Sequence, residues 1–416
     1  MSYKNLRHKI ISCVMAGTIG VVGAFSLVPA PTANAGLLDA VLSVGMQFAA
    51  LDQQISYLNG NGRNELFSSM QQQYGVNNDP ELNNMLDQIM VNLNTGVAAV
   101  DPSINEKPYN YFINNDMSFN AFCTLGHNLS VNTGLFSLTQ NEDEIAVVLA
   151  HEIGHGQKDH VSKGIRNGII ATLGASVLAN ATGGIGGLVL GTVVNNQLQA
   201  KAISKPQEWE ADNLAFDYIV KTSYNPGACA ALWQRVTEQM NGERRNDFAG
   251  EIFAPGDHPT GVQRRDNYSK KLTELSDNHV VATEGTITIN GKNFLVCAND
   301  VGGATSAAER AYLAAGNLSR VYENTNPETV KKQIEAIKKK KMQEDEELAE
   351  KGEYRKREFS LNAMANKKDN MPKVRPLPQR AYAEDGALFI DGIYILNEIE
   401  GEPSAAELAD IFNLIK

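Results

Sequence analysis

The sequence predicts an α+β fold that is mainly helical, with one small sheet in its first half and two small strand-strand-helix units near the C-terminus. Apolar residues recur with helical spacing through 62–100, and alternating apolar residues follow between 109 and 132. Short alternating stretches around an Asn-Gly and an Asp-Gly pair recur near the C-terminus, a pattern typical of β-hairpins. A chain of 416 residues is long enough to hold two or three such units.

The N-terminal residues, 1–35, are predicted to be a signal peptide. A basic segment at 4–9 precedes an apolar run at 10–28, and Ala33 and Ala35 form a small-x-small cleavage site. We therefore expect a protein that is exported through a cleaved signal peptide and is located in a periplasm or outside the cell. The alternative is an uncleaved membrane anchor, because the apolar run approaches the length of a membrane span.

The overall composition argues against two classes of protein. The formal net charge is -11, so the chain lacks the excess of basic residues that nucleic-acid-binding proteins carry. Of its 4 cysteines, Cys13 lies in the predicted signal peptide, which leaves too few for a disulfide-stapled scaffold. We therefore expect an ordinary globular protein with no nucleic-acid partner.

The C-terminal third contains a weak internal repeat. Residues 287–295 resemble 388–396, and a Ser-Ala-Ala-Glu sequence then opens a helix in each copy. The highly charged segment between the copies is predicted to be a solvated helix. The predicted parts of the chain are the signal peptide (1–35), a main domain (36–278), a small α+β unit (279–325), a charged helical linker (326–370) and a second small α+β unit (371–416).

An uncharged stretch rich in glycine and alanine extends through 167–200. A buried helical hairpin beside the functional site is the favoured structure for it, because asparagine and glycine residues interrupt any continuous membrane span. The alternative is a segment that lies against a membrane surface.

The most informative residues are the run His151-Glu152-Ile153-Gly154-His155. On a helix, histidines at positions i and i+4 project from one face and can bind one zinc ion. Glu152 lies next to them and can take a proton from a zinc-bound water, which is a nucleophile near neutral pH because zinc lowers its pKa to about 7. We therefore expect one zinc ion per chain, bound by His151 and His155, with Glu152 as the catalytic base.

A helix start precedes this motif. Thr139 and Glu142, three residues apart, form a predicted capping box, and the acidic residues at 142–144 suit the positive end of a helix. Apolar residues continue with helical spacing up to His151. The motif is thus predicted to lie on a capped helix that directly follows the small sheet.

A zinc site of this kind needs a third protein ligand. The segment 208–212 can supply it, because Glu208 and Asp212 are four residues apart and share one face of a predicted helix, while Glu210 points away. A glutamate from this helix would complete a His-His-Glu set. Asp212 would then accept the free ring N–H of a ligating histidine and fix its tautomer.

Two further histidines are not assigned to the metal. His160 follows His155 by five residues and would project from another face of a continuous helix, so we expect it to be structural or exposed. His127 lies in a predicted turn and is expected to be exposed to solvent, with a substrate contact as the alternative.

Taken together, these motifs resemble one zincin family. In chain order, the matching segments are Asn120-Ala121-Phe122, residues 131–135, the helix 144–155, Glu208 with Asp212, and His258-Pro259 with Arg264. The combination is similar to the gluzincin metallopeptidase family that contains the CAAX prenyl endopeptidases, the membrane heat-shock proteases and the periplasmic outer-membrane-assembly proteases. The resemblance covers residues 63–275 and implies a zincin-like fold.

The resemblance also implies a role for each matching residue. Glu208 would be the third metal ligand. His258 would lie over the metal, either as a fourth ligand in a latent state or as a donor to the transition state, and Arg264 would help to anchor the same loop. The segment 120–122 would form the strand beside which a peptide substrate adds.

The predicted function is that of a zinc-dependent endopeptidase that hydrolyses peptide bonds of protein substrates, with misfolded or misassembled envelope proteins as the expected class. The alternative is a chaperone or assembly factor for envelope proteins whose peptidase activity is latent. An intact Glu152 favours catalysis, whereas a His258 that fills the open metal position would favour latency. Neither the cleavage specificity nor the oligomeric state follows from the sequence.

Overall fold

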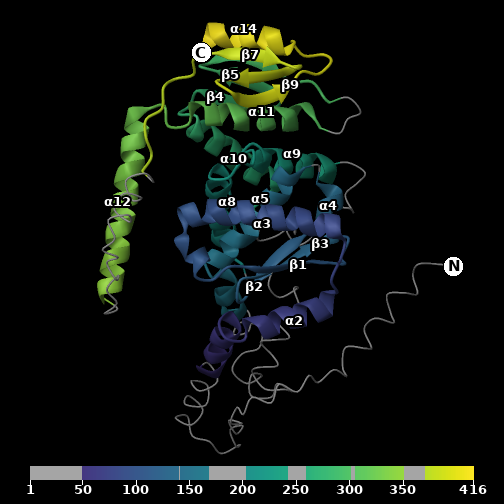
Figure 1. Cartoon of the computed structure of the whole chain (residues 1–416), viewed down its shortest axis with the longest axis vertical. Coiled ribbons are helices and arrows are strands. Elements are labelled where there is room, and N and C mark those ends of the chain that lie inside the picture. Colours follow the sequence, from purple (N-terminus) through teal and green to yellow (C-terminus); the bar gives the residue numbers. More distant parts are fainter. Residues whose placement is uncertain (1–48, 140, 168–202, 242–258, 301–304, 351–370) are drawn as a thin grey trace, which may run out of the picture.

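The computed structural model describes residues 49–139, 141–167, 203–241, 259–300, 305–350 and 371–416 (Figure 1). The predicted signal peptide and His258 lie outside these ranges, as does nearly all of the uncharged stretch at 167–200. Across the described residues, no helix is both long enough and apolar enough to span a bilayer. The predicted fold class is confirmed, because helices dominate and the strands form small sheets.

The first sheet has three strands, β1 (Asn110–Asn114), β2 (Ala121–Thr124) and β3 (Asn128–Asn132). Their spatial order is β1-β3-β2, so β3 is central and β2 is an edge strand. The central strand runs parallel to β1 and antiparallel to β2. Among the described residues, this geometry leaves one side of the β2 backbone without a neighbouring strand.

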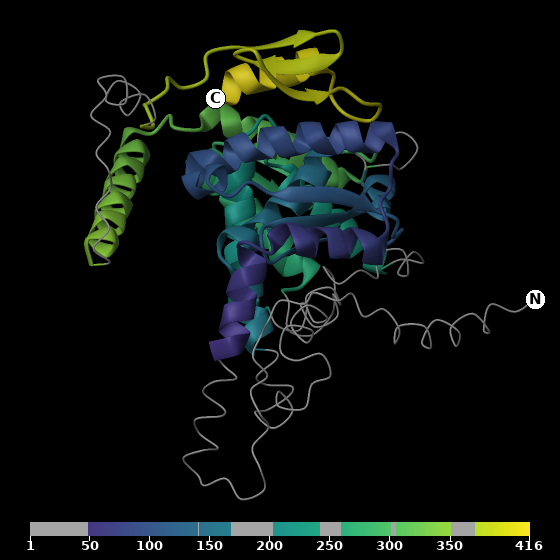
Figure 2. The same ribbon diagram turned by 60° about the horizontal axis from the view of Figure 1, so that its bottom comes forward.

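Helices cover both faces of this sheet. Figure 2 shows α3 (Pro80–Val100) along one face and α2 (Arg63–Tyr74) along the other. Alternate residues of each strand point to opposite faces, so Cys123 packs with the core on the α3 side while Phe122 packs with Leu66 of α2. Two apolar layers thus hold β2 in place from above and below.

The helix that carries the His-Glu-x-x-His sequence is α5 (Glu142–Gln157). Its N-cap is Asn141, whose side chain accepts a hydrogen bond from the Glu144 N–H. The predicted capping box at Thr139 is therefore wrong. A short helix, α4 (Thr133–Leu138), precedes α5. Thr139 is the C-cap of α4, and its hydroxyl donates to the Leu135 carbonyl instead.

The partner of α5 is α8 (Lys205–Val220), which begins at a capping box formed by Ser204 and Gln207. The two helices approach closely where Gly154 meets Ala211. A Cβ at Gly154 would lie 3.2 Å from both the Cα and the carbonyl oxygen of Ala211. Glycine at the fourth position of the motif therefore permits the packing of α5 on α8.

Two more helices, α9 (Ala228–Asn241) and α10 (Gly261–Leu275), pack against each other and continue the helical body. They are followed by a three-stranded sheet, β4 (Val280–Thr283), β5 (Thr286–Ile289) and β6 (Lys292–Val296), and by α11 (Ala307–Tyr322). After α12 (Pro327–Glu350) the same order recurs in β7 (Ala381–Glu384), β8 (Ala387–Ile390), β9 (Ile393–Asn397) and α14 (Ala405–Ile415).

The internal repeat is thus larger than predicted, because each copy has three strands before its helix rather than two. The additional turns are Glu284-Gly285 in the first copy and Asp385-Gly386 in the second, and all four residues have positive φ. Each copy also has a register shift in its middle strand, at corresponding positions. The turn of the first copy is a Glu-Gly pair, which is a weaker hairpin signal than Asn-Gly or Asp-Gly, and the strand before it was missed. The turn of the second copy, Asp385-Gly386, is a strong hairpin signal, so the strand before it was missed although the sequence indicates it.

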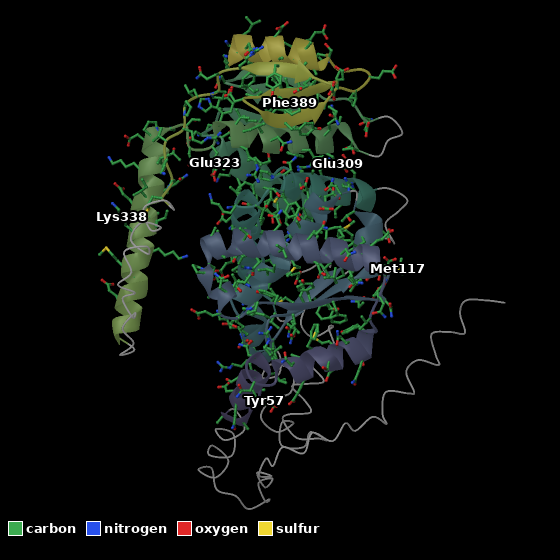
Figure 3. All side chains as sticks on the ribbon, viewed as in Figure 1. Tyr57, Met117, Glu309, Glu323, Lys338 and Phe389 are labelled. Atoms are coloured by element: carbon green, nitrogen blue, oxygen red, sulfur yellow. The ribbon has the colours of Figure 1, made fainter. Side chains whose placement is uncertain are left out.

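The two copies interlock. The helix of the first copy, α11, packs on β9 of the second, and α14 packs on β6 of the first. Phe294 and Phe412 meet edge to face at this junction, with ring centroids 6.3 Å apart. The buried core continues from the main domain into both copies, across the predicted boundary at 278/279. The charged helix α12, marked by Lys338 in Figure 3, stands away from this body.

A buried ion cluster joins α11 to α5. The guanidinium of Arg235 donates to Glu144 of α5, at 2.5 Å, and to both carboxylate oxygens of Glu309 of α11, at 3.1 and 3.3 Å. All three side chains are buried, and Figure 3 shows Glu309 at the junction between α11 and the helices beneath it. Removing the arginine would leave two carboxylates close together without a cation between them.

We expect the Arg235→Met variant to lose about 3–5 kcal/mol of unfolding free energy, because one partner of a buried charge cluster is removed. Urea unfolding followed by circular dichroism measures the loss. The matched control is Lys270→Met, since Lys270 is exposed and forms a surface pair with Glu274. Equal unfolding midpoints for the two variants would contradict this prediction.

Candidate metal centre

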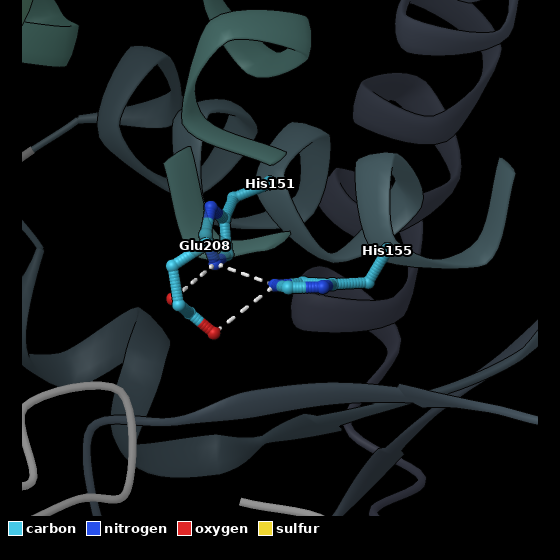
Figure 4. A group of neighbouring side chains, drawn as sticks. All are labelled: His151, His155 and Glu208. Atoms are coloured by element: carbon cyan, nitrogen blue, oxygen red, sulfur yellow. Dashed lines mark hydrogen bonds and ion pairs between the residues drawn. The ribbon is translucent and has the colours of Figure 1, made fainter. Parts of the chain in front are cut away.

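Three side chains converge between α5 and α8. The Nε2 atoms of His151 and His155 lie 3.1 Å apart, and each lies 3.5 Å from one carboxylate oxygen of Glu208 (Figure 4). All three residues are buried, and their ligand atoms lie within 4.8 Å of one another. Two imidazole nitrogens and a carboxylate are a donor set that zinc favours. These residues therefore fit the predicted metal.

The second ring nitrogen of His151 faces a charged network. Its Nδ1 lies 3.0 Å from Asp212 Oδ1. Arg264 on α10 donates through Nε to Asp212 Oδ2 at 2.8 Å and also contacts Oδ1, and the Tyr268 hydroxyl donates to the same oxygen at 3.0 Å. The guanidinium of Arg264 stacks 3.7 Å over the Trp233 ring. Asp212 thus lies where the sequence placed it, behind a histidine of the cluster.

Charges in the cluster shift the pKa values of its members. Burial and Arg264 lower the pKa of His151, but its contacts with Asp212 and Glu208 outweigh them and raise this pKa to about 9. Burial, together with the neighbouring His151, lowers the pKa of His155 to about 3. A metal ion must therefore compete with a proton at His151 and not at His155.

Glu152 lies between this cluster and the edge of the sheet. Its Oε2 accepts a hydrogen bond from the backbone N–H of Cys123 on β2, at 3.0 Å. Burial raises the pKa of the Glu152 carboxyl to about 7, although the contact with Cys123 favours the charged form. A carboxyl with a pKa near neutrality is suited to proton transfer at physiological pH.

His160 does not project away from His155, as was predicted for a continuous helix; it lies beside that histidine. The ring is buried, and its Nδ1 lies 3.0 Å from the Nδ1 of His155. Its Nε2 lies 3.1 Å from Glu210 Oε2. The prediction assumed a continuous helix, but α5 ends at Gln157 and Asp159 has φ 51°, so the chain turns and brings His160 back to His155.

His127 is buried rather than exposed, which corrects the sequence prediction. Its ring stacks on Tyr109, with centroids 4.4 Å apart, and its Nδ1 lies 2.7 Å from the Lys107 carbonyl oxygen. Burial, reinforced by the charge of Lys107, lowers the pKa of His127 to about 4. His127 is therefore neutral in the folded protein near pH 7 and belongs to the packing behind the sheet.

The predicted substrate segment forms the edge of the first sheet. Ala121 and Phe122 begin β2, and Asn120 precedes it. The Phe122 ring points into the second apolar cluster and packs against Tyr74, with centroids 5.3 Å apart. Since all three side chains are buried, this segment offers backbone groups rather than side chains to a partner.

The chain is similar to a known peptidase family over nearly half of its length. Residues 81–280 match the model of peptidase family M48. The resemblance inferred from the motifs is thereby confirmed, and the match contains both α5 and α8, the helices that carry the candidate metal ligands. A protease function that depends on a metal and acts on proteins is supported by this family.

Individual relatives agree with the family. The chain is 24% identical over 246 residues to the beta-barrel assembly-enhancing protease of Escherichia coli K12, covering 57% of this chain and 46% of that protein. It is 26% identical over 184 residues to the metalloprotease LoiP of the same strain, covering 44% of this chain and 69% of LoiP. The chain thus spans about half the length of the first of these relatives.

A more distant relative is the mitochondrial metalloendopeptidase OMA1 of Saccharomyces cerevisiae. The identity is 24% over 187 residues, which is 43% of this chain and 53% of that protein. The family match itself ends at residue 280 and therefore does not include the C-terminal units.

We expect Glu208→Gln to weaken zinc binding, because the variant loses the charged ligand of the cluster. Chelator competition on the purified protein measures the zinc dissociation constant. We expect this constant to rise at least about 10-fold, because losing even an outer-shell partner of a metal ligand has an effect of that size. The control is Asp217→Asn, an exposed acid on the same helix that forms an ion pair with Lys271 on the protein surface. Equal zinc affinity in the two variants would exclude Glu208 as a ligand.

The neutral state of His127 predicts a pH dependence of stability. Its folded pKa lies below the ordinary value of 6.5, so the unfolded chain binds the proton more tightly. The contribution of neutral His127 to the free energy of unfolding is fully present above pH 6.5 and is lost as the pH falls towards 4. Between pH 7 and pH 5 this contribution falls by about 2 kcal/mol.

We therefore expect the free energy of unfolding to fall less steeply over this range in His127→Asn, a substitution that tolerates the positive φ of 54° at this position. Urea unfolding of both proteins at both pH values cancels the contributions that they share. Identical losses in the two proteins would show that His127 does not titrate in this way.

Proposed function

We propose that the chain is a zinc-dependent endopeptidase of the cell envelope or exterior. The observation that carries this proposal is the position of Glu152, which is buried beside the His151, His155 and Glu208 cluster and bonded to the edge strand β2. A base, a metal-binding group and a strand edge that could bind peptide backbone are the parts that hydrolysis of a peptide bond requires. The match to peptidase family M48 supports the same reaction class.

In this mechanism the chain supplies the proton transfers and the alignment. Glu152 takes a proton from the attacking water and delivers it to the leaving amine. Asp212 accepts from Nδ1 of His151, which leaves Nε2 free to bind the metal. When bound, zinc would supply Lewis-acid polarisation of the scissile carbonyl and would lower the pKa of the attacking water.

The peptide is proposed to add to the open edge of β2. The Cys123 N–H already donates to Glu152, so the substrate backbone would pair beside Ala121 and place its scissile bond next to the base. Recognition through backbone groups selects extended chains rather than one side-chain sequence. Unfolded or misassembled envelope proteins present such chains, and one relative is named a beta-barrel assembly-enhancing protease.

Export and the role of His258 belong to the same proposal and rest on the sequence alone. The basic and apolar segments at 4–28 support a signal peptide. His258 lies six residues before Arg264, outside the described residues, and is proposed as either an inhibitory ligand or an oxyanion donor.

We expect Glu152→Gln to lower the rate of hydrolysis of a quenched peptide by about 10²–10⁴-fold, since the glutamine cannot take a proton from water. Zinc content, measured by mass spectrometry, stays at the wild-type level because the ligands are intact. The matched control is Glu142→Gln, an exposed acid in the first turn of the same helix.

A Glu152→Gln variant with wild-type hydrolysis would exclude this glutamate as the base. A variant that has lost hydrolysis but still corrects an envelope-assembly defect would favour the alternative function, that of a chaperone with a latent protease site.

A further inference from the structure

Both histidines of the candidate metal centre use their second ring nitrogen, but with different partners. His151 faces the buried carboxylate of Asp212, whereas His155 faces another histidine. We propose that His160 and Glu210 act as positioning residues that hold His155 in the one tautomer able to bind the metal through Nε2. This inference rests on the proposed function, since it concerns the same zinc site.

The tautomers follow from the geometry. A histidine that binds a metal through Nε2 carries its proton on Nδ1. The Nδ1–H of His155 then points at Nδ1 of His160, 3.0 Å away, which must accept it. The proton of His160 therefore lies on Nε2, from which it is donated to Glu210 Oε2 at 3.1 Å. Each group in this series has one defined role, and the carboxylate at its end fixes the direction of both hydrogen bonds.

The local fold places His160 for this contact. The break after Gln157 and the positive φ of Asp159 turn the chain, and a new helical segment then begins at His160. Only 1% of His160 is exposed, and a buried imidazole without hydrogen-bond partners would be unfavourable. Glu210 lies on α8 two residues beyond Glu208, so the same helix supplies a metal ligand and, from its neighbouring face, the end of this series.

Two simpler roles for His160 fit less well. A fourth metal ligand would face the Nε2 atoms of the cluster, but His160 instead contacts the opposite edge of the His155 ring. If His160 only linked α5 to α8 structurally, its two ring nitrogens would not both need a hydrogen-bond partner in His155 and Glu210. Glu210 is half-exposed and also lies 4.0 Å from Lys158 Nζ, so its influence on the metal is indirect and weaker than that of Asp212.

The test compares zinc dissociation constants, by chelator competition, in wild type, His160→Leu and His160→Asn. We expect His160→Leu to raise the dissociation constant about 10–100-fold, as loss of an outer-shell partner of a metal-bound histidine does. His160→Asn should recover most of the affinity, because its amide oxygen can take the place of Nδ1 and accept from His155. With zinc saturating, kcat should fall in His160→Leu while KM is unchanged, since no substrate contact is removed.

A second pair of variants tests the end of the series on the protein surface, where folding is not at risk. We expect Glu210→Ala to raise the zinc dissociation constant several-fold, and the control Asp217→Asn to leave it at the wild-type value. Wild-type affinity in both His160→Leu and Glu210→Ala would overturn the inference. Equal losses in His160→Leu and His160→Asn would also overturn it, because they would indicate a packing role. If His160→Leu does not fold, Glu210→Ala alone decides.

These outcomes are separate from failure of the proposed function. If the wild-type protein binds no zinc or shows no Glu152-dependent hydrolysis, the proposed function fails. If both are present and the variants of His160 and Glu210 match wild type, only the positioning role fails.

Discussion

The close packing of α5 on α8 is the constraint on which the site depends. Gly154 lets the two helices approach at Ala211, and this approach brings Glu208 and Asp212 of one helix up to the histidines of the other. A larger side chain at Gly154 would push the helices apart by an amount that matters, because metal–ligand distances tolerate deviations of only about 0.2 Å. The glycine of the motif is thus as much a part of the centre as its histidines.

The chemistry-bearing part of the site could be predicted because it is local. Helical spacing alone places His151 beside His155 and Glu208 on the face of Asp212. Helical spacing does not predict where a helix ends or which other helix packs against it. The position of His160 was therefore predicted wrongly, because α5 was assumed to continue beyond residue 157. The burial of His127 was missed for a similar reason, since it arises from stacking on Tyr109, which directly precedes β1.

The fold shows the same division between local and distant causes. The fold class, the strands of the first sheet and the helical repeat openings follow from short periodic patterns. The start of α5 does not follow from such a pattern, because Thr139 and Asn141 are both residue types that favour an N-cap. In the structure Thr139 is the C-cap of α4, and Asn141 is the N-cap of α5. The first strand of the first C-terminal copy precedes a Glu-Gly turn, which is a weak sequence signal, and its pairing with the middle strand defines it. The corresponding strand of the second copy precedes Asp385-Gly386, a strong hairpin signal, so that strand could have been predicted from the sequence.

The C-terminal copies are tied to the site more closely than a boundary at 278/279 would suggest. Glu309 of α11 shares Arg235 with Glu144 in the first turn of α5. Further along α11, Arg320 donates to the carbonyl oxygen of Val220 at 3.1 Å, at the last turn of α8. One helix of the repeat therefore contacts the beginning of α5 and the end of α8. Both anchors lie at the same end of the α5–α8 pair, where the start of α5 meets the segment that follows α8 through the Asn225 N–H and Asp143. The contacts of α11 therefore help to set the relative position of the two helices that carry His151, His155 and Glu208.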